Sequence, residues 1–444
     1  MKTSNIFKAF LTIVPFILVI PSIAQVNKIE KSIIESVDKN TPMALQLLKK
    51  AVNINSGTMN FEGVKKVGGM FKTELDKLGF TTQLTSGETY GRAGHLIASR
   101  TGKKNAPKLL LIGHLDTVFE LDSPFQQFNM VNDSIMNGPG VSDMKGGDVI
   151  IILTMRALYE TGVLDDMNIE IVMTGDEEKS GKPLDLSKHD LIEAAKRADI
   201  ALGFENADGN SETIVVARRG STDWELKVSG KASHSSQIFT ENVGVGAIYE
   251  TSRILNEFYR QLAKEENLTF NPGFIIGGTS LEANKELTGG NALGKSNVVA
   301  QQVIVRGDLR AISPEQLQMA KEKMIAIVSE NYNGTNAEII FNNGGYPPME
   351  AAAGNRKLLE IYSKVSQDLG FGIISSVNPR NAGAADISFT SGHVEMAIDG
   401  LGLTGGDYDH TINETGNLNN VGLQAKRASL LIYRLNQKKN VDKK

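Results

Sequence analysis

Between residues 108 and 204 the chain alternates short apolar segments with one longer segment that is apolar on most faces. Residues 108–112, 169–174 and 200–204 have the length and composition of buried strands, whereas residues 149–158 are typical of a buried helix. Parallel strands need long crossover connections, usually helices. The alternation therefore predicts an α/β fold, in which a mostly parallel sheet is flanked by helices.

A different pattern begins near residue 216. Apolar and polar residues alternate over residues 224–228 and again over residues 303–305, as in a sheet with one face in water. A helix is predicted to begin after Ser313, with Pro314 in its first turn and Gln316 placed for a capping box, and to run to about residue 332. These features predict a smaller α+β domain.

Helical spacing returns after this segment, so the smaller domain interrupts the larger one. With 444 residues, the chain is long enough for two domains. We predict that residues 27–215 and 345–440 form the larger domain and that residues 216–344 form the insert. Residues 1–24 are assigned to a targeting segment.

The targeting segment has the pattern of a secretory signal peptide. Lys2 and Lys8 precede an apolar run over residues 9–20, which Pro21 ends, and small residues allow cleavage after Ala24. The apolar run is short for a membrane span, although an uncleaved N-terminal anchor is the alternative. We expect an exported protein, in the periplasm or outside the cell, with no membrane span in its mature form.

The chain has no cysteine, so disulfides, thiolate metal sites and cysteine nucleophiles are excluded. Any bound metal must be held by histidine, aspartate or glutamate. The net charge of -4 gives no sign of the basic face that nucleic-acid binding usually needs.

Polar clusters follow the predicted parallel strands, at the edge of the sheet where such folds bind ligands. The first cluster, GHLDTV, contains His114 and Asp116. Two residues apart in an extended segment, they point to the same side, and a carboxylate beside an imidazole favours metal binding. The alternative is a hydrogen-bonded core histidine at a strand end.

The second cluster, GPGVSDMKGG, places Asp143 among glycines just before the buried helix. A phosphate loop or an ordinary tight turn is the alternative, but the Walker spacing is absent. Because two metals must approach a bridging carboxylate closely, an aspartate in such an open loop suits that position.

The third cluster, TGDEEKSG, brings together Asp176, Glu177 and Glu178 after a buried strand. Adjacent like charges repel without a cation, although most acidic runs are solvated turns. Glu205 follows the next strand, and His410 lies in a glycine-rich loop with further carboxylates.

Together, GHLDTV, GPGVSDMKGG and DEE resemble the motifs of the co-catalytic zinc metallopeptidase family that includes glutamate carboxypeptidase, acetylornithine deacetylase, succinyl-diaminopimelate desuccinylase and aminoacylase. The motifs are most similar to the glutamate carboxypeptidase type. The resemblance implies two zinc ions per chain, with cobalt and manganese as alternatives, and a metal-ligand set of His114, Asp143, Glu178, Glu205 and His410. In this family the residue at Asp143 bridges the two ions.

The resemblance also implies roles for residues that do not bind metal. Asp116 would support His114, and Glu177 would be the general base. In the insert, which is a lid and dimerisation domain in the family, His234 would hold the scissile carbonyl oxygen, often across a dimer interface. Asn297 and Arg310 would bind the substrate, although a surface salt bridge is the alternative for Arg310.

These residues predict an exported metallo-exopeptidase that hydrolyses a peptide or amide bond next to a free C-terminal carboxylate. The alternative on the same scaffold is an N-acyl amino acid deacylase or desuccinylase. A noncatalytic binding protein is a third reading, which the presence of the whole residue set disfavours. Expected partners are a small peptide or N-acyl amino acid and a second copy of the chain, bound through the insert.

Overall fold

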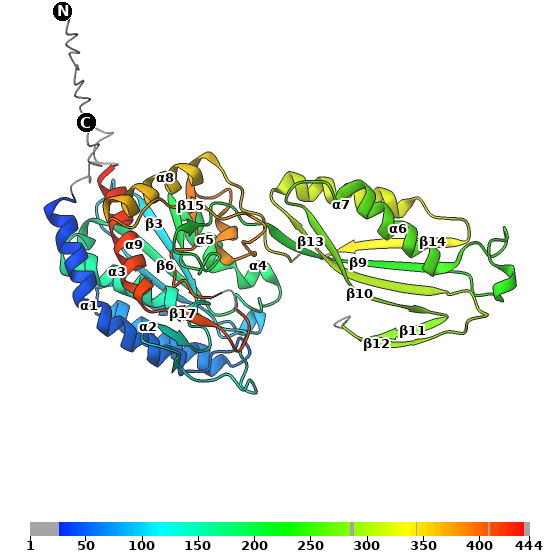
Figure 1. The fold of residues 1–444 in the computed structure, drawn as a ribbon, viewed down its shortest axis with the longest axis horizontal. Helices are drawn as coiled ribbons and strands as arrows, with labels where there is room; N and C mark the ends of the chain where they lie inside the picture. Colours follow the sequence, from blue (N-terminus) through cyan, green and yellow to red (C-terminus); the bar gives the residue numbers. More distant parts are fainter. Residues whose placement is uncertain (1–25, 285–287, 343, 407–408, 439–444) are drawn as a thin grey trace, which may run out of the picture.

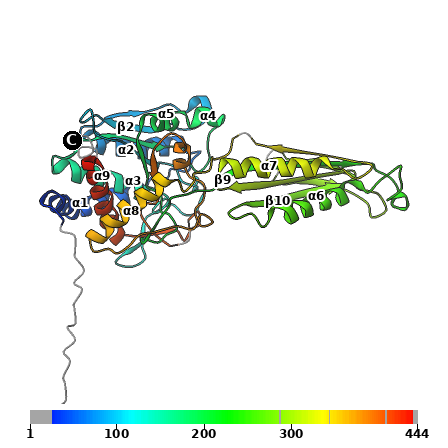
Figure 2. The same cartoon turned by 90° about the horizontal axis from the view of Figure 1, so that it is seen from above.

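The computed structural model describes residues 26–284, 288–342, 344–406 and 409–438. A larger α/β body and a smaller, elongated α+β body lie side by side (Figures 1 and 2). The predicted signal peptide, residues 1–24, lies outside the described residues. No helix in the described part of the chain is long and apolar enough to cross a membrane.

The larger body is built on a six-stranded sheet. In spatial order its strands are β1 (Thr81–Leu84), β2 (Leu96–Arg100), β6 (Asn168–Thr174), β3 (Lys108–His114), β7 (Ile200–Gly203) and β16 (Met396–Ile398). The four strands from β6 to β16 are parallel, while β1 and β2 form an antiparallel edge. The predicted α/β class is confirmed, with the parallel part of the sheet at its centre.

Helices cover both faces of this sheet. They are α1 (Lys28–Val52), α2 (Phe61–Asp76), α3 (Lys145–Glu160), α4 (Leu184–Ser187), α5 (His189–Arg197), α8 (Ala353–Asp368) and α9 (Asn419–Lys438). Alternate residues of β3 enter different cores, because side chains alternate across a strand. Leu109 and Leu111 pack in the core beneath α1, α2, α3, α8 and α9, whereas Leu110 and Ile112 pack in the core with α5.

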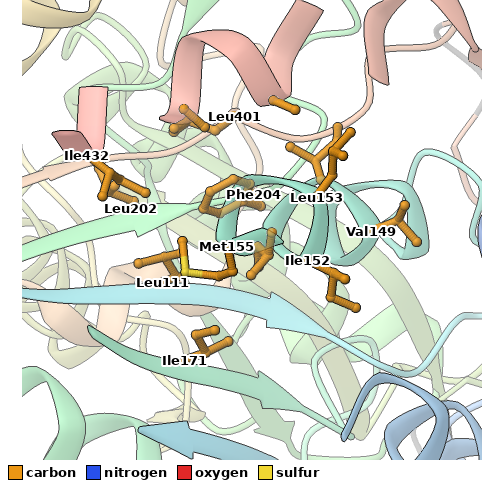
Figure 3. Close-up of a cluster of buried hydrophobic side chains, with 14 of the residues drawn as sticks. Leu111, Val149, Ile152, Leu153, Met155, Ile171, Leu202, Phe204, Leu401 and Ile432 are labelled. Carbon is orange, nitrogen blue, oxygen red and sulfur yellow. The ribbon is translucent and has the colours of Figure 1, made fainter. Parts of the chain in front are cut away.

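Helix α3 is buried on nearly every face, as its sequence predicts. Figure 3 shows Ile152 and Met155 of α3 among Leu111, Ile171 and Leu202 of the sheet. The helix begins at Lys145, four residues before the predicted start. Its N-terminus therefore lies within the glycine-rich cluster and directly after Asp143 and Met144.

The smaller body has a four-stranded antiparallel sheet, in the order β10 (Thr269–Gly278), β13 (Gln302–Ala311), β9 (Gly220–Gly230) and β14 (Thr335–Phe341). Helices α6 (Gly246–Leu262) and α7 (Pro314–Ser329) cover one face, where their apolar side chains meet those of β9 and β13. A hairpin of β11 (Ser280–Ala283) and β12 (Gly290–Leu293) extends from this sheet.

The N-terminus of α7 forms only half of the predicted capping box. Ser313 Oγ accepts a hydrogen bond from the Gln316 amide at 3.1 Å, but the Gln316 side chain accepts from the amide of Ile312 rather than from that of Ser313. The helix ends at Ser329, before the predicted residue 332.

Short strands complete the larger body. They are β4 (Asn129–Met130), β5 (Ile135–Asn137), β8 (Thr213–Ile214), β15 (Ser375–Ser376) and β17 (Thr415–Asn417). The pairing of β17 with β5 brings the C-terminal loop that carries His410 towards the glycine-rich cluster before α3. This pairing places the two segments next to each other at one edge of the larger sheet.

Candidate metal centre

The polar clusters meet at one edge of the larger sheet. In the parallel register, His114 at the end of β3 lies opposite Thr174 at the end of β6, and Ile112 lies opposite Gly203 at the end of β7. Glu177 and Glu178 follow β6, and Glu205 follows β7. Because parallel strands end at the same edge, acids far apart in the sequence converge there.

Asp143 lies between two histidines. Its Oδ1 is 3.0 Å from Nε2 of His114, and its Oδ2 is 3.0 Å from Nε2 of His410. The two carboxylate oxygens thus face one imidazole each, from β3 on one side and from the C-terminal loop on the other. This is the arrangement that a carboxylate bridging two cations requires.

Two more acids complete the cluster, one beside each histidine. Glu205 Oε1 is 3.5 Å from His114 Nε2, and Glu178 Oε2 is 3.2 Å from His410 Nε2. Donor atoms of His114, Asp143 and Glu178 all lie within 4.8 Å of one another. Within the described part of the chain, the buried Oε1 of Glu178 has no hydrogen-bond partner, which leaves it available to a cation.

The carboxylates give the cluster a negative electrostatic field, which favours bound cations. Burial would lower the pKa of His114, but carboxylates, first that of Glu205, raise it well above its usual value. Hydrogen bonds to Asp143 and Glu178 raise the pKa of His410 to about 11. Burial raises the pKa of Glu178 to about 7, and Asp143 adds to this. Imidazole and carboxylate ligands in this number suit zinc.

Asp116 is fully buried and contacts several residues of the site. Its carboxylate lies 3.5 Å from Nδ1 of His114, which is also 3.0 Å from the Asp116 carbonyl oxygen. It accepts hydrogen bonds from the backbone amides of Glu177 at 3.0 Å and Glu178 at 3.2 Å, and from the Thr58 hydroxyl at 2.6 Å. One carboxylate therefore orients a histidine and two acids.

Glu177 is partly buried, and its pKa is raised well above the usual range. Burial is the largest cause, the charges of Asp386 and Glu178 add to it, and His114 opposes it. A carboxylate with a raised pKa holds a proton more readily than a solvent-exposed one, which suits a group that accepts a proton and later delivers it.

Two residues support the site without a role predicted from the sequence. Glu414, one of the further carboxylates in the loop of His410, is buried and accepts hydrogen bonds from the backbone amides of Gly140, Ser142 and Asp143 at 3.0–3.2 Å. Glu414 thereby stabilises the glycine-rich loop, although the two segments are far apart in the sequence. Thr58 carries no local motif, so only the fold reveals its contact with Asp116.

His234 and Asn297 lie together at the far end of the smaller body. The amide of Ser235 donates to the Asn297 carbonyl oxygen at 2.9 Å, and His234 forms a bridge with Val298. His234 follows the distal end of β9, which has 11 residues and spans roughly 33 Å, and Asn297 precedes the start of β13, which pairs with that end. Strand β9 leads away from the larger body (Figure 1), so His234, which comes after its far end, is far from the metal centre of its own chain.

Arg310 lies at the opposite end of the same sheet. It pairs with Ser221 and Thr269 in the strand register, close to the larger body. Its Nε lies 2.8 Å from Oδ2 of Asp308, and both side chains are about one-third exposed. The structure thus separates Arg310 from His234 and Asn297 by most of the length of β13.

Comparisons with known proteins identify the family to which the chain is similar. The model of "Peptidase family M20/M25/M40" matches residues 110–433. Carboxypeptidase G2 from Pseudomonas sp. is 27% identical over 396 residues, covering 87% of each chain. A probable succinyl-diaminopimelate desuccinylase from Staphylococcus aureus is 28% identical over 167 residues, which cover 36% of this chain and 39% of that protein.

Solved structures share the fold. Aminopeptidase PepT from Bacillus cereus has a TM-score of 0.68 at 19% identity, with 89% of this chain and 99% of that chain covered. The M20 family metallo-carboxypeptidase from Sulfolobus solfataricus has a TM-score of 0.64 at 18% identity, with the same coverage. At these identities the likeness describes architecture alone.

Proposed function

Because the chain belongs to peptidase family M20/M25/M40, we propose that this metallopeptidase is an exported dizinc exopeptidase that cleaves a peptide or amide bond beside a free C-terminal carboxylate. The observation that carries the two-metal assignment is the position of Asp143, with one oxygen 3.0 Å from each of two histidines. His114 and Glu205 would hold one ion, and Glu178 and His410 the other.

Zinc at this centre would act as a Lewis acid and lower the pKa of water to about 7. Glu177 accepts a proton from the attacking water and later delivers it to the leaving amine. Asp116 keeps the tautomer and orientation of His114 and, through the two backbone amides, the position of Glu177. The two adjacent glutamates would have different roles, since Glu178 would bind metal while Glu177 remains free to transfer a proton.

The choice of an exopeptidase rests on two supports. The similarity to carboxypeptidase G2 runs over 87% of both chains, whereas the similarity to the desuccinylase covers 36% of this chain. Arg310, near the larger body, offers a planar guanidinium that can bind both oxygens of a substrate carboxylate. The N-acyl amino acid deacylase stays the second candidate.

The position of His234 favours catalysis across a dimer. It is exposed at the end of a strand that spans roughly 33 Å, so it would serve the centre of a second copy of the chain. There it would donate a hydrogen bond to the oxyanion that forms from the scissile carbonyl. Asn297, beside it, would contact the same substrate group.

Export is proposed from the N-terminal sequence alone. The basic residues, the short apolar run and the small residues before Gln25 form a signal-peptide pattern. An exported exopeptidase would release amino acids from peptides outside the cytoplasm.

Product identification tests the proposed function. The purified protein is incubated with zinc and with a panel of dipeptides, folyl-glutamates and N-acyl amino acids, and the products are identified by mass spectrometry. We expect free C-terminal amino acids from peptide or folyl-glutamate substrates. Cleavage of N-succinyl or N-acetyl amino acids alone would assign a deacylase, and no cleavage by the zinc-loaded protein would contradict both assignments.

A further inference from the structure

A buried ionic network lies beneath the acidic cluster and outside the metal centre. Lys188, at the start of α5, is fully buried, and its Nζ is 2.9 Å from Oδ1 of Asp386 and 3.3 Å from Oδ1 of Asp176. The same Nζ is 3.3 Å from the Asp176 carbonyl oxygen. A charged lysine without solvent is held here by two carboxylates, and it fixes the backbone directly before Glu177.

Tyr346 joins this network to Glu177. Its hydroxyl is 2.9 Å from the Glu177 carbonyl oxygen and 3.2 Å from Oδ1 of Asp386, and the Ser180 hydroxyl lies 3.1 Å away. The Lys188 ammonium lies 5.5 Å from the centre of the Tyr346 ring. The backbone of Glu177 is therefore held by two hydrogen bonds: its amide donates to Asp116, and its carbonyl oxygen accepts from the Tyr346 hydroxyl.

Tyr346 lies between β14 and α8, in the returning linker that leads back from the smaller body to the larger one; the outgoing linker is the segment between β8 and β9, which contains Arg218. The Tyr346 carbonyl oxygen accepts a hydrogen bond from the amide of Ser221 at 2.9 Å, and the amides of Arg218 and Met349 each donate to the other's carbonyl oxygen at 2.8–2.9 Å. The outgoing and returning linkers thus form a short antiparallel ladder. A methyl group on Gly345 would collide with the Ser221 carbonyl oxygen, so the returning linker packs closely against the start of β9.

The outgoing linker also reaches the metal centre. Arg218 is buried, and its guanidinium lies 2.9 Å from Oδ2 of Asp399. Oδ1 of Asp399 accepts a hydrogen bond from the amide of Glu205 at 3.2 Å. The returning linker therefore contacts the Glu177 backbone directly through the Tyr346 hydroxyl, whereas the outgoing linker reaches the Glu205 backbone only through the ion pair of Arg218 with Asp399.

We propose that Tyr346 is a positioning residue that ties the linker of the smaller body to the general base, so that the orientation of that body sets the position of Glu177. The inference rests on the proposed role of Glu177 in hydrolysis. It assigns the smaller body a second contribution to catalysis, which acts within one chain and does not depend on His234.

Removal of the Tyr346 hydroxyl tests this positioning role. Tyr346→Phe keeps the ring packed on Phe389 and deletes the contact with Glu177. We expect kcat to fall about 10-fold, with KM and zinc content unchanged, since one hydrogen bond that aligns the base is lost. Tyr362→Phe is the matched control, because it deletes a buried hydroxyl bound to Gln424.

Gly345→Ala tests the connection to the smaller body, because the added methyl pushes the returning linker away from Ser221 at the start of β9. We expect it to lower kcat in the wild-type background but to have little further effect in the Tyr346→Phe background, where the hydrogen bond to the Glu177 carbonyl oxygen is already absent. Equal effects in both backgrounds would contradict the proposed coupling. If this variant does not fold, the comparison of the two tyrosine variants still decides the positioning role.

The outcomes separate the inference from the function on which it rests. If Glu177→Gln abolishes hydrolysis while Tyr346→Phe and Tyr362→Phe have equal kcat, the positioning role is wrong and the proposed function stands. If Glu177→Gln retains full activity, or the zinc-loaded protein cleaves no substrate of the panel, the proposed function fails and the inference fails with it. A lower kcat in Tyr346→Phe alone supports the inference.

Discussion

The carboxylate of Asp116 accepts a hydrogen bond from the backbone amide of Glu177 at 3.0 Å, across 61 residues of sequence. The same carboxylate lies 3.5 Å from Nδ1 of His114. The orientation of a metal-ligand candidate and the position of the base candidate are therefore not independent. A change at either one is transmitted through a single buried group.

Substitution of the base tests its assignment. Glu177→Gln keeps the shape of the side chain and removes its basicity, so we expect kcat to fall by about 10²–10⁴-fold. Zinc content, measured by atomic emission, should not change. Glu193→Gln is the control, because Glu193 lies on the surface in an ion pair with Lys196. Near-normal kcat in the Glu177 variant with its metals retained would exclude Glu177 as the base.

Lys188 is expected to stabilise the fold strongly. Lys188→Met leaves the carboxylates of Asp176 and Asp386 buried without their cation, and loss of one partner of a buried pair typically costs about 3–5 kcal/mol. Urea denaturation should show this decrease in the free energy of unfolding. Lys39→Met, which removes an exposed ion pair with Glu160, should change it by less than about 1 kcal/mol. Equal stability of the two variants would contradict the structural role of the network.

Substitutions of Arg310 and of His234 should affect different kinetic parameters. Arg310→Ala should raise KM and lower kcat, because it removes the guanidinium that we propose binds the substrate carboxylate. His234→Ala should mainly lower kcat, because oxyanion contacts strengthen in the transition state. Steady-state kinetics on the best substrate of the panel measures both. The same change of KM in both variants would contradict this division.

Complementation tests whether His234 acts on a second chain. Inactive Glu177→Gln chains are mixed with inactive His234→Ala chains, so that a mixed dimer contains one centre with both groups intact. We expect partial recovery of activity. No recovery, with subunit exchange shown independently by mass spectrometry of labelled chains, would mean that His234 does not serve a partner.

The N-terminal segment yields a simple chemical test. If residues 1–24 are a cleaved signal peptide, the exported protein begins at Gln25. N-terminal sequencing or intact-mass measurement of protein from the periplasm or the medium shows this directly. An exported protein that retains Met1 would instead indicate the uncleaved anchor.

The core of the site was predictable because its residues follow local patterns. His114 ends a strand, and Glu178 and Glu205 follow strands, that apolar runs reveal, and parallel strands must end at a common edge. Asp143 is marked by its glycines and by the buried helix after it. The sequence therefore indicates which elements meet, and the structure brings these four side chains and His410 together.

The supporting contacts were not predictable, since they join residues without a shared pattern. Thr58 reaches Asp116 over 58 residues, and Tyr346 reaches Glu177 over 169 residues. Such pairs depend on how whole elements pack, which periodicity does not encode. The separation of His234 from Arg310 has the same origin, because it depends on the length and antiparallel register of β9 and β13.

The zinc content of the wild-type protein and of Asp143→Asn tests the two-metal centre most directly. After metal stripping and reloading, atomic emission should find about two zinc ions per wild-type chain, and hydrolysis should return as zinc is added. Asp143→Asn should bind less zinc and lose most activity, whereas the surface control Asp166→Asn should behave as wild type. Full activity with one zinc ion or none, or an Asp143→Asn protein that retains both ions and its kcat, would contradict the account.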